Sequence, residues 1–247
     1  ATPLDPAMLT RHFGADRLAA EEEGGELLSF FRADGAHVVL PAKERASLRP
    51  HGQIFRTGNR LVPDEASLTT TVWMGGVFHS MLTQGHVSIN RFLSTTHSYL
   101  GLYRSHGQRL FVERDGAWHL LGEPSAFEMT PSGARWLYRH AELLLEVRSW
   151  AAVDRHELWL TVRVLDGAAC RLLVSNHVSL NGDDGSDAVP ARWIRDDRGV
   201  IVACLADTEV GRRFPDGAFR IDVAPGTAIE RVGGDELLFS DGRSRGQ

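Results

Sequence analysis

Short apolar segments separated by turn residues dominate the chain from residue 26 onward. Residues 157–165 (ELWLTVRVL) alternate strictly, with four aliphatic side chains on one face and Trp159, Thr161 and Arg163 on the other. This period of two is typical of a β-strand with one buried face. Further strands are predicted over residues 136–138, 143–147, 171–174, 200–204, 219–223 and 236–239.

Asp115-Gly116 lies between two more apolar segments, residues 110–112 and 118–121, and this arrangement predicts a β-hairpin. Strand signals recur about every 8–14 residues, without the strand–helix alternation of a doubly wound or TIM-barrel fold. The predicted fold class is therefore all-β: a large antiparallel sandwich or barrel with a short helical N-terminal lead.

The first 25 residues have a different pattern. Asp5 followed by Pro6 is typical of a helix N-terminus and predicts a short helix over residues 7–13. A second helical segment is predicted over residues 15–23 (ADRLAAEEE), ending at Gly24-Gly25. We therefore expect a helical lead over residues 1–25 and a single β domain over residues 26–247, a length that suits one large β domain.

Composition narrows the functional classes. The net charge of −5 argues against broad electrostatic binding of nucleic acid. The sequence has no 18-residue apolar run and no signal-peptide pattern, so we expect a soluble cytoplasmic protein with no membrane contact.

Cys170 and Cys204 stand singly in apolar runs and are expected to be buried free thiols, with one disulfide between them as the alternative. Histidine spacings do not match a zinc site and nucleotide-binding motifs are missing, so no metal and no cofactor are predicted.

Residues 172–181 (LLVSNHVSLN) place polar side chains at the end of a predicted strand. His177 follows Asn176, and Asn181 comes shortly after. An imidazole with an ordinary pKa near about 6.5 can give or take a proton at neutral pH. The alternative is a histidine that only satisfies buried turn carbonyls.

Three motifs resemble those of aldose 1-epimerases (galactose mutarotases). Residues 175–181 (SNHVSLN) resemble the family's Asn-His strand motif, and residues 56–61 (RTGNRL) resemble its early Arg-x-Ala/Gly-Asn-Arg-Ile motif. Gly85-His86 follows where the family has His-Gly-Gly, although Val87 and Ser88 replace the glycines. The resemblance implies a supersandwich that interconverts sugar anomers by acid/base ring opening.

The resemblance also implies residue roles. His177 would be the acid, and His86 would steady the ring-oxygen side of the sugar. The base would be Glu236, with Glu230 as the alternative. The side chains that would bind the substrate are Asn59, Arg60, His86, Asn176 and Asn181.

Tryptophan adds an argument from chemistry, because a flat indole stacks on the face of a pyranose. Trp73, beside Gly75-Gly76, is the tryptophan predicted to face a cleft and bind sugar; filling the core is the alternative role.

A second resemblance covers residues 73–78 (WMGGVF), 111–113 and 118–121. These segments are similar to the N-terminal β-sandwich of cellobiose-phosphorylase-type enzymes. The predicted function is thus carbohydrate binding, either as an aldose 1-epimerase or as a non-catalytic sandwich module of a larger glycan phosphorylase or hydrolase. A sandwich that binds another protein and has no sugar site is a third hypothesis. The expected partners are a mono- or oligosaccharide and either a helical catalytic domain or a second copy in a homodimer.

Overall fold

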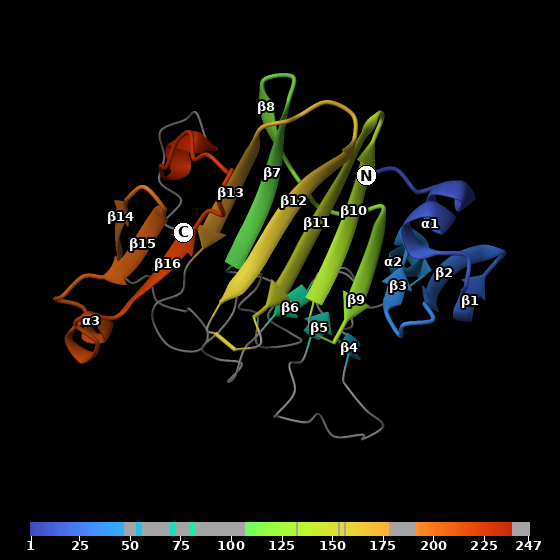
Figure 1. The fold of residues 1–247 in the computed structure, drawn as a ribbon, viewed down its shortest axis with the longest axis horizontal. Helices are drawn as coiled ribbons and strands as arrows, with labels where there is room; N and C mark the ends of the chain where they lie inside the picture. Colours follow the sequence, from blue (N-terminus) through green and yellow to red (C-terminus); the bar gives the residue numbers. More distant parts are fainter. Residues whose placement is uncertain are drawn as a thin grey trace. The chain divides into compact units, whose positions relative to one another are not determined.

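The computed structural model describes residues 1–46, 53–55, 70–72, 80–82, 107–131, 133–152, 154–155, 157–177 and 191–238. These residues are mostly antiparallel β-strands with a few short helices (Figure 1), which confirms the all-β prediction. The chain divides into two compact units, residues 1–176 and 177–247. The domain bounds predicted above, 1–25 and 26–247, stay a prediction.

Seven strands form the largest sheet in the described part of the first unit. In order they are β1 (Leu18–Glu23), β2 (Glu26–Phe31), β3 (His37–Val39), β9 (Ala126–Thr130), β10 (Gly133–His140), β11 (Leu143–Ala151) and β12 (Leu158–Asp166). A second sheet has the order β13 (Leu172–His177), β7 (Gly107–Arg114) and β8 (Ala117–Leu120). A third has the order β4 (Gln53–Phe55), β5 (Thr70–Val72) and β6 (Ser80–Leu82).

Both faces of the seven-stranded sheet bury apolar side chains. On one face, Phe13 of α1 (Pro6–Phe13) packs with Phe30 and Leu137 of the sheet. On the other face, Leu110 of β7 and Leu121 after β8 pack against a separate buried cluster. That cluster consists of Val39, Phe127, Met129, Ala134, Trp136 and Val147. The second sheet thus covers one face of the first, which is the packing of a β-sandwich.

Two sequence patterns are confirmed residue by residue. β7 and β8 form the predicted hairpin, and both turn residues, Asp115 and Gly116, have the positive φ that a two-residue hairpin turn requires. In β12, Leu160 and Val162 pack against the core cluster while Trp159 on the alternate face stays partly exposed. The alternation therefore identified the buried face correctly.

Two predictions of local structure are wrong. Residues 18–23 form strand β1 instead of a helix, because Gly24-Gly25 with positive φ turns the chain into β2 and pairs the two strands. Residues 236–239 were expected to form a strand, but residues Asp235–Leu237 form a short 3₁₀ helix, η1. The Glu236 carboxylate accepts the Gly234 backbone N–H there, a local bond that competes with strand pairing.

The helix predicted at Asp5-Pro6 is confirmed as α1, and Asp5 caps it by accepting the Met8 N–H at 2.9 Å. Asp5→Ala is expected to lower the free energy of unfolding by about 0.5–2 kcal/mol, since an orphan helix N–H loses its acceptor. Asp5→Asn should restore most of this stability in urea titrations. An equal loss in both variants would instead assign the effect to the Asp5–Arg139 ion pair, 3.4 Å long.

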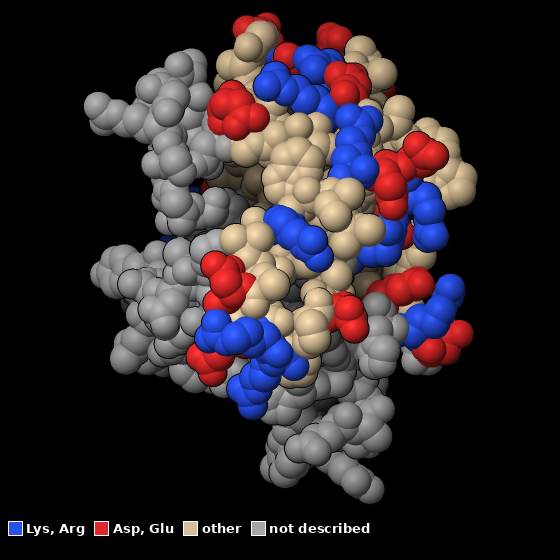
Figure 2. All heavy atoms as spheres, turned by 90° about the vertical axis from the view of Figure 1, so that its left-hand side faces the viewer, with Lys and Arg blue, Asp and Glu red and all other residues tan. Residues whose placement is uncertain are grey.

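The second unit has its own antiparallel sheet, in the order β14 (Ala191–Arg195), β15 (Gly199–Cys204) and β16 (Ala218–Asp222). Short helix α3 (Glu209–Arg213) follows β15. Arg220 bridges Asp196 and Asp222 on this sheet, at 2.9 Å and 2.8 Å. Figure 2 shows basic and acidic side chains interspersed over the described part of the face that it views. This mixture is consistent with ion pairs between neighbouring side chains of opposite charge.

Candidate functional site

The end of β13 carries the polar side chains singled out from the sequence. Asn176 Oδ1 accepts a hydrogen bond from Nε2 of Gln108, a buried residue of β7, at 3.0 Å. The neighbouring strand therefore fixes the orientation of the Asn176 amide. His177 is the last residue of β13, and its side chain lies outside the described part, as do Asn59, Arg60, Trp73, His86 and Asn181.

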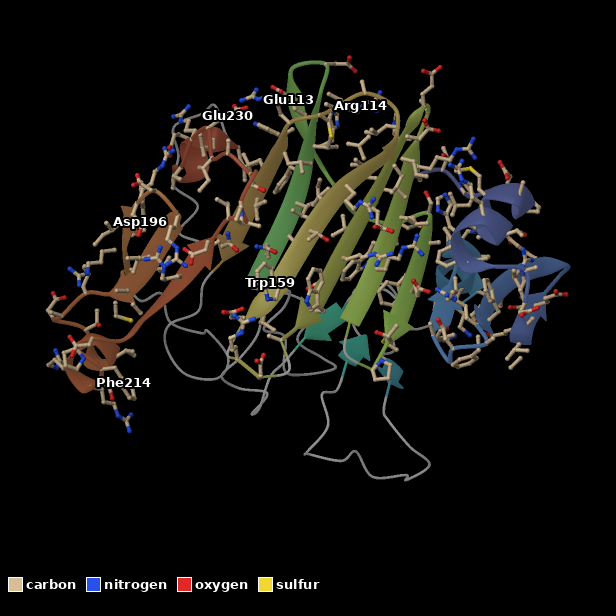
Figure 3. All side chains as sticks on the ribbon, in the orientation of Figure 1. Glu113, Arg114, Trp159, Asp196, Phe214 and Glu230 are labelled. Carbon is tan, nitrogen blue, oxygen red and sulfur yellow. The ribbon has the colours of Figure 1, made fainter. Side chains whose placement is uncertain are left out.

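Glu236, the predicted base, lies in η1 and is exposed. Both carboxylate oxygens accept the Gly234 N–H, at 3.0 and 3.1 Å, and Oε1 lies 3.9 Å from a guanidinium nitrogen of Arg231. These contacts close a surface turn. Glu230, the alternative base, is exposed in the preceding loop (Figure 3). A catalytic role for either carboxylate stays a prediction.

The α1 face of the large sheet carries a buried ionic cluster that sequence reasoning did not find. Glu128, Arg135 and Glu146 come from three adjacent strands, β9, β10 and β11. Arg135 Nε lies 2.7 Å from Glu146 Oε2, and its Nη1 lies 3.4 Å from Glu128 Oε2. Arg32 also pairs with Glu128. The cluster neutralises two carboxylates that are each less than a tenth exposed.

Arg135 also joins the cluster to α1. Its Nη1 donates to the carbonyl of His12 at 3.1 Å, and its guanidinium lies 5.2 Å from the centre of the Phe13 ring. Burial and the nearby Arg135 charge lower the pKa of His12. The neutral form of the His12 imidazole avoids repulsion by the positive charge of Arg135.

Glu146 is held in its charged form. Burial by itself raises the pKa of this carboxyl, but the charges and hydrogen bonds of Arg135 and Arg148 outweigh burial and lower it. A carboxylate held ionised in this way is poorly suited to donate a proton. Glu146 is therefore a poor candidate for a general acid.

Two tryptophans lie further along the same face of β11 and β12. Trp150 and Trp159 are directly opposite each other, with near-parallel rings whose centroids lie 6.1 Å apart. Because alternate residues share a face, Arg148 and Thr161 stand beside them, and Arg163 follows. We call these five residues the β11–β12 platform; Figure 3 shows Trp159 on β12. The alternation that placed Trp159, Thr161 and Arg163 together off the core face was the signal for it in the sequence.

Within the described ranges, no three His, Cys, Asp or Glu side chains converge as metal ligands. No helix of that part is long and apolar enough to cross a membrane. Cys170 and Cys204 are free thiols, as predicted, but only partly buried, and burial raises the pKa of both.

Comparison with known proteins decides between the two resemblances. A family model described as the glycoside phosphorylase supersandwich domain matches residues 15–246. The chain belongs to this family. The supersandwich of phosphorylase-type enzymes is thereby confirmed, whereas the aldose 1-epimerase resemblance is not, since neither match is to such an enzyme.

A curated relative agrees with the family assignment. The chain is 32% identical, over 256 aligned residues, to the 1,2-beta-oligoglucan phosphorylase of Listeria innocua serovar 6a. The alignment covers 96% of this supersandwich chain but 23% of the relative. The chain therefore spans about a quarter of the length of the phosphorylase that it matches.

Proposed function

We propose that this chain is a non-catalytic, carbohydrate-binding supersandwich module of a larger glycan phosphorylase. The observation that carries the proposal is the match of almost the whole chain to a supersandwich family and to about a quarter of a phosphorylase. The substrate class is a β-1,2-linked gluco-oligosaccharide, by analogy with the name of that relative. The partner is the catalytic domain of the same enzyme, which we expect to be helical.

The contacts of three described carboxylates, Glu128, Glu146 and Glu236, fit structural roles and so support a module that leaves acid/base chemistry to another domain. Glu128 and Glu146 are buried against arginines that keep Glu146 ionised, while Glu236 closes an exposed turn. Acid/base catalysis of ring opening or glycosidic cleavage needs one group that holds a proton and one that accepts it. The arginine contacts of Glu146 lower its pKa and thus disfavour the protonated form that a general acid needs.

The test compares the complete polypeptide that contains this chain with the 247-residue chain by itself. Phosphorolysis transfers a terminal glucosyl group from its glycosidic oxygen to phosphate, which yields glucose 1-phosphate and a glucan shortened by one unit. We expect the complete polypeptide to release glucose 1-phosphate from β-1,2-gluco-oligosaccharides and phosphate, and residues 1–247 to release none.

The epimerase alternative is measured in the same preparations by polarimetry of freshly dissolved α-glucose and α-galactose. We expect residues 1–247 to leave the spontaneous rate of anomer interconversion unchanged. Acceleration by this chain that His177→Ala abolishes would overturn the proposal and restore His177 as an acid. Phosphorolysis by residues 1–247 without a further domain would overturn it as well.

A further inference from the structure

The β11–β12 platform exposes aromatic surface that the core does not use. Trp159 is 37% exposed, whereas Trp136, two strands away in the same sheet, is 7% exposed and packs against Phe127 with ring centroids 5.4 Å apart. A tryptophan that serves only to fill a core is buried like Trp136. Trp159 instead presents part of its indole to solvent.

The two sides of the tryptophan pair have different neighbours within the sheet. Trp150 pairs with Gly133 of β10, where a Cβ would lie 2.9 Å from the Ser149 carbonyl oxygen and 3.3 Å from the Trp150 Cβ. Glycine thus permits the close approach of β10 to β11 at Trp150. On the other side, β12 is the last strand of the sheet, so no described strand of this sheet lies beyond Trp159.

Polar donors stand next to the exposed indole. The side chains of Arg148 and Arg163 are 49% and 68% exposed. Both guanidiniums form ion pairs with the buried Glu146 carboxylate, with N–O distances of 3.1 and 3.8 Å. Glu146 is itself held by Arg135, so Arg148 has a fixed partner at 3.1 Å, while the contact of Arg163 is longer. Their other N–H groups remain available to hydroxyl oxygens, because each guanidinium carries five donors.

We propose that the β11–β12 platform is a binding site for an oligosaccharide, in which the Trp159 ring stacks on a sugar ring. Arg148 and Arg163 donate hydrogen bonds to hydroxyls of the neighbouring sugar units. A neutral ligand with apolar ring faces and a polar rim fits an indole next to hydrogen-bond donors, whereas a purely apolar ligand would leave the guanidiniums without acceptors. The inference rests on the proposed function for its ligand class and deepens it by naming the surface.

The test measures binding of β-1,2-gluco-oligosaccharides to the 247-residue chain by isothermal titration calorimetry. Trp159→Ala is expected to weaken binding by about fivefold or more, as for a tryptophan central to a binding surface. Trp159→Phe keeps an aromatic ring and should recover part of the affinity. The matched control is Trp193→Ala, since Trp193 is 52% exposed on β14 and should leave the affinity unchanged.

Thermal unfolding of each variant separates a binding effect from a folding defect. Arg163→Gln is a second binding variant, chosen because this side chain is largely exposed and its replacement should not disturb folding. Unchanged affinity in both Trp159→Ala and Arg163→Gln would overturn the inference, as would an equal loss in Trp193→Ala. Phosphorolysis by the complete polypeptide together with unchanged binding in these variants would refute the platform and leave the proposed function standing. Binding lost in Trp159→Ala without any phosphorolysis would refute the function and support the platform.

Discussion

Arg135→Met is expected to lower the free energy of unfolding by about 3–5 kcal/mol, because it leaves two buried carboxylates without their shared cation. Glu128 and Glu146 have side chains 7% and 3% exposed, and Arg135 is the residue that contacts both. The same substitution removes the donor to the His12 carbonyl and the guanidinium over Phe13. The loss should appear as a lower urea midpoint in the transition of the first unit.

The matched control is Arg163→Met, which removes a guanidinium from the same Glu146 at 3.8 Å. This side chain is 68% exposed, so solvent screens its charge and the expected change is below about 1 kcal/mol. Similar losses in both variants would mean that net charge, and not the buried geometry, determines the effect.

Acid titration checks the cause independently. The pKa of Glu146 is lowered in the folded protein, so its contribution to stability is present above about pH 4.5 and is lost as pH falls through the lowered folded value. In Arg135→Met the two carboxylates keep only their more exposed arginine partners, and protonation at acid pH relieves their burial. The stability difference between wild type and variant should therefore narrow below about pH 4.5. A difference that stays constant across this range would point to lost packing instead.

Local turn chemistry explains which parts of the fold the sequence could predict. Asp115-Gly116 between two apolar segments gave the β7–β8 hairpin correctly, because both residues tolerate positive φ. Gly24-Gly25 carries the same signal, yet the acidic run before it favoured a helix. Residues 18–23 form a strand because they pair with β2. Helix propensity is a property of the segment alone and does not include a pairing partner.

The ionic cluster and the platform could not be assembled from the sequence because both depend on strand register. Glu128, Arg135 and Glu146 are 7 and 11 residues apart in the chain, and they meet on one face only once the register of β9, β10 and β11 is fixed. Alternation did place Trp159 off the core face, but its ring partner Trp150 follows from the β11–β12 pairing. Asn176, in contrast, was singled out from its segment by itself, and its role in binding sugar stays a prediction; its hydrogen bond with Gln108 depends on the neighbouring strand.

Phe127→Ala is the second substitution with a large expected effect, about 3–5 kcal/mol of lost unfolding free energy. Phe127 is 1% exposed and belongs to the cluster on which Leu110 of β7 and Leu121, just after β8, pack. Removing the ring leaves a cavity between two sheets whose backbones are each held by ladder hydrogen bonds, so neither can collapse freely into the space. Trp136 also loses its ring contact, and its near-ultraviolet circular dichroism should change together with the thermal midpoint.

Phe214→Ala is the control for that prediction, because Phe214 is 60% exposed in the second unit (Figure 3) and should change stability by no more than about 0.5 kcal/mol. Both substitutions remove a phenyl ring, one buried and one exposed. A difference between them therefore tests whether Phe127 lies in the interior of the sandwich. If Phe127→Ala were as mild as Phe214→Ala, the contact between β7–β8 and the large sheet would not stabilise the unit. A large effect confined to Phe127 would establish that this contact holds the two sheets of the phosphorylase-type sandwich together.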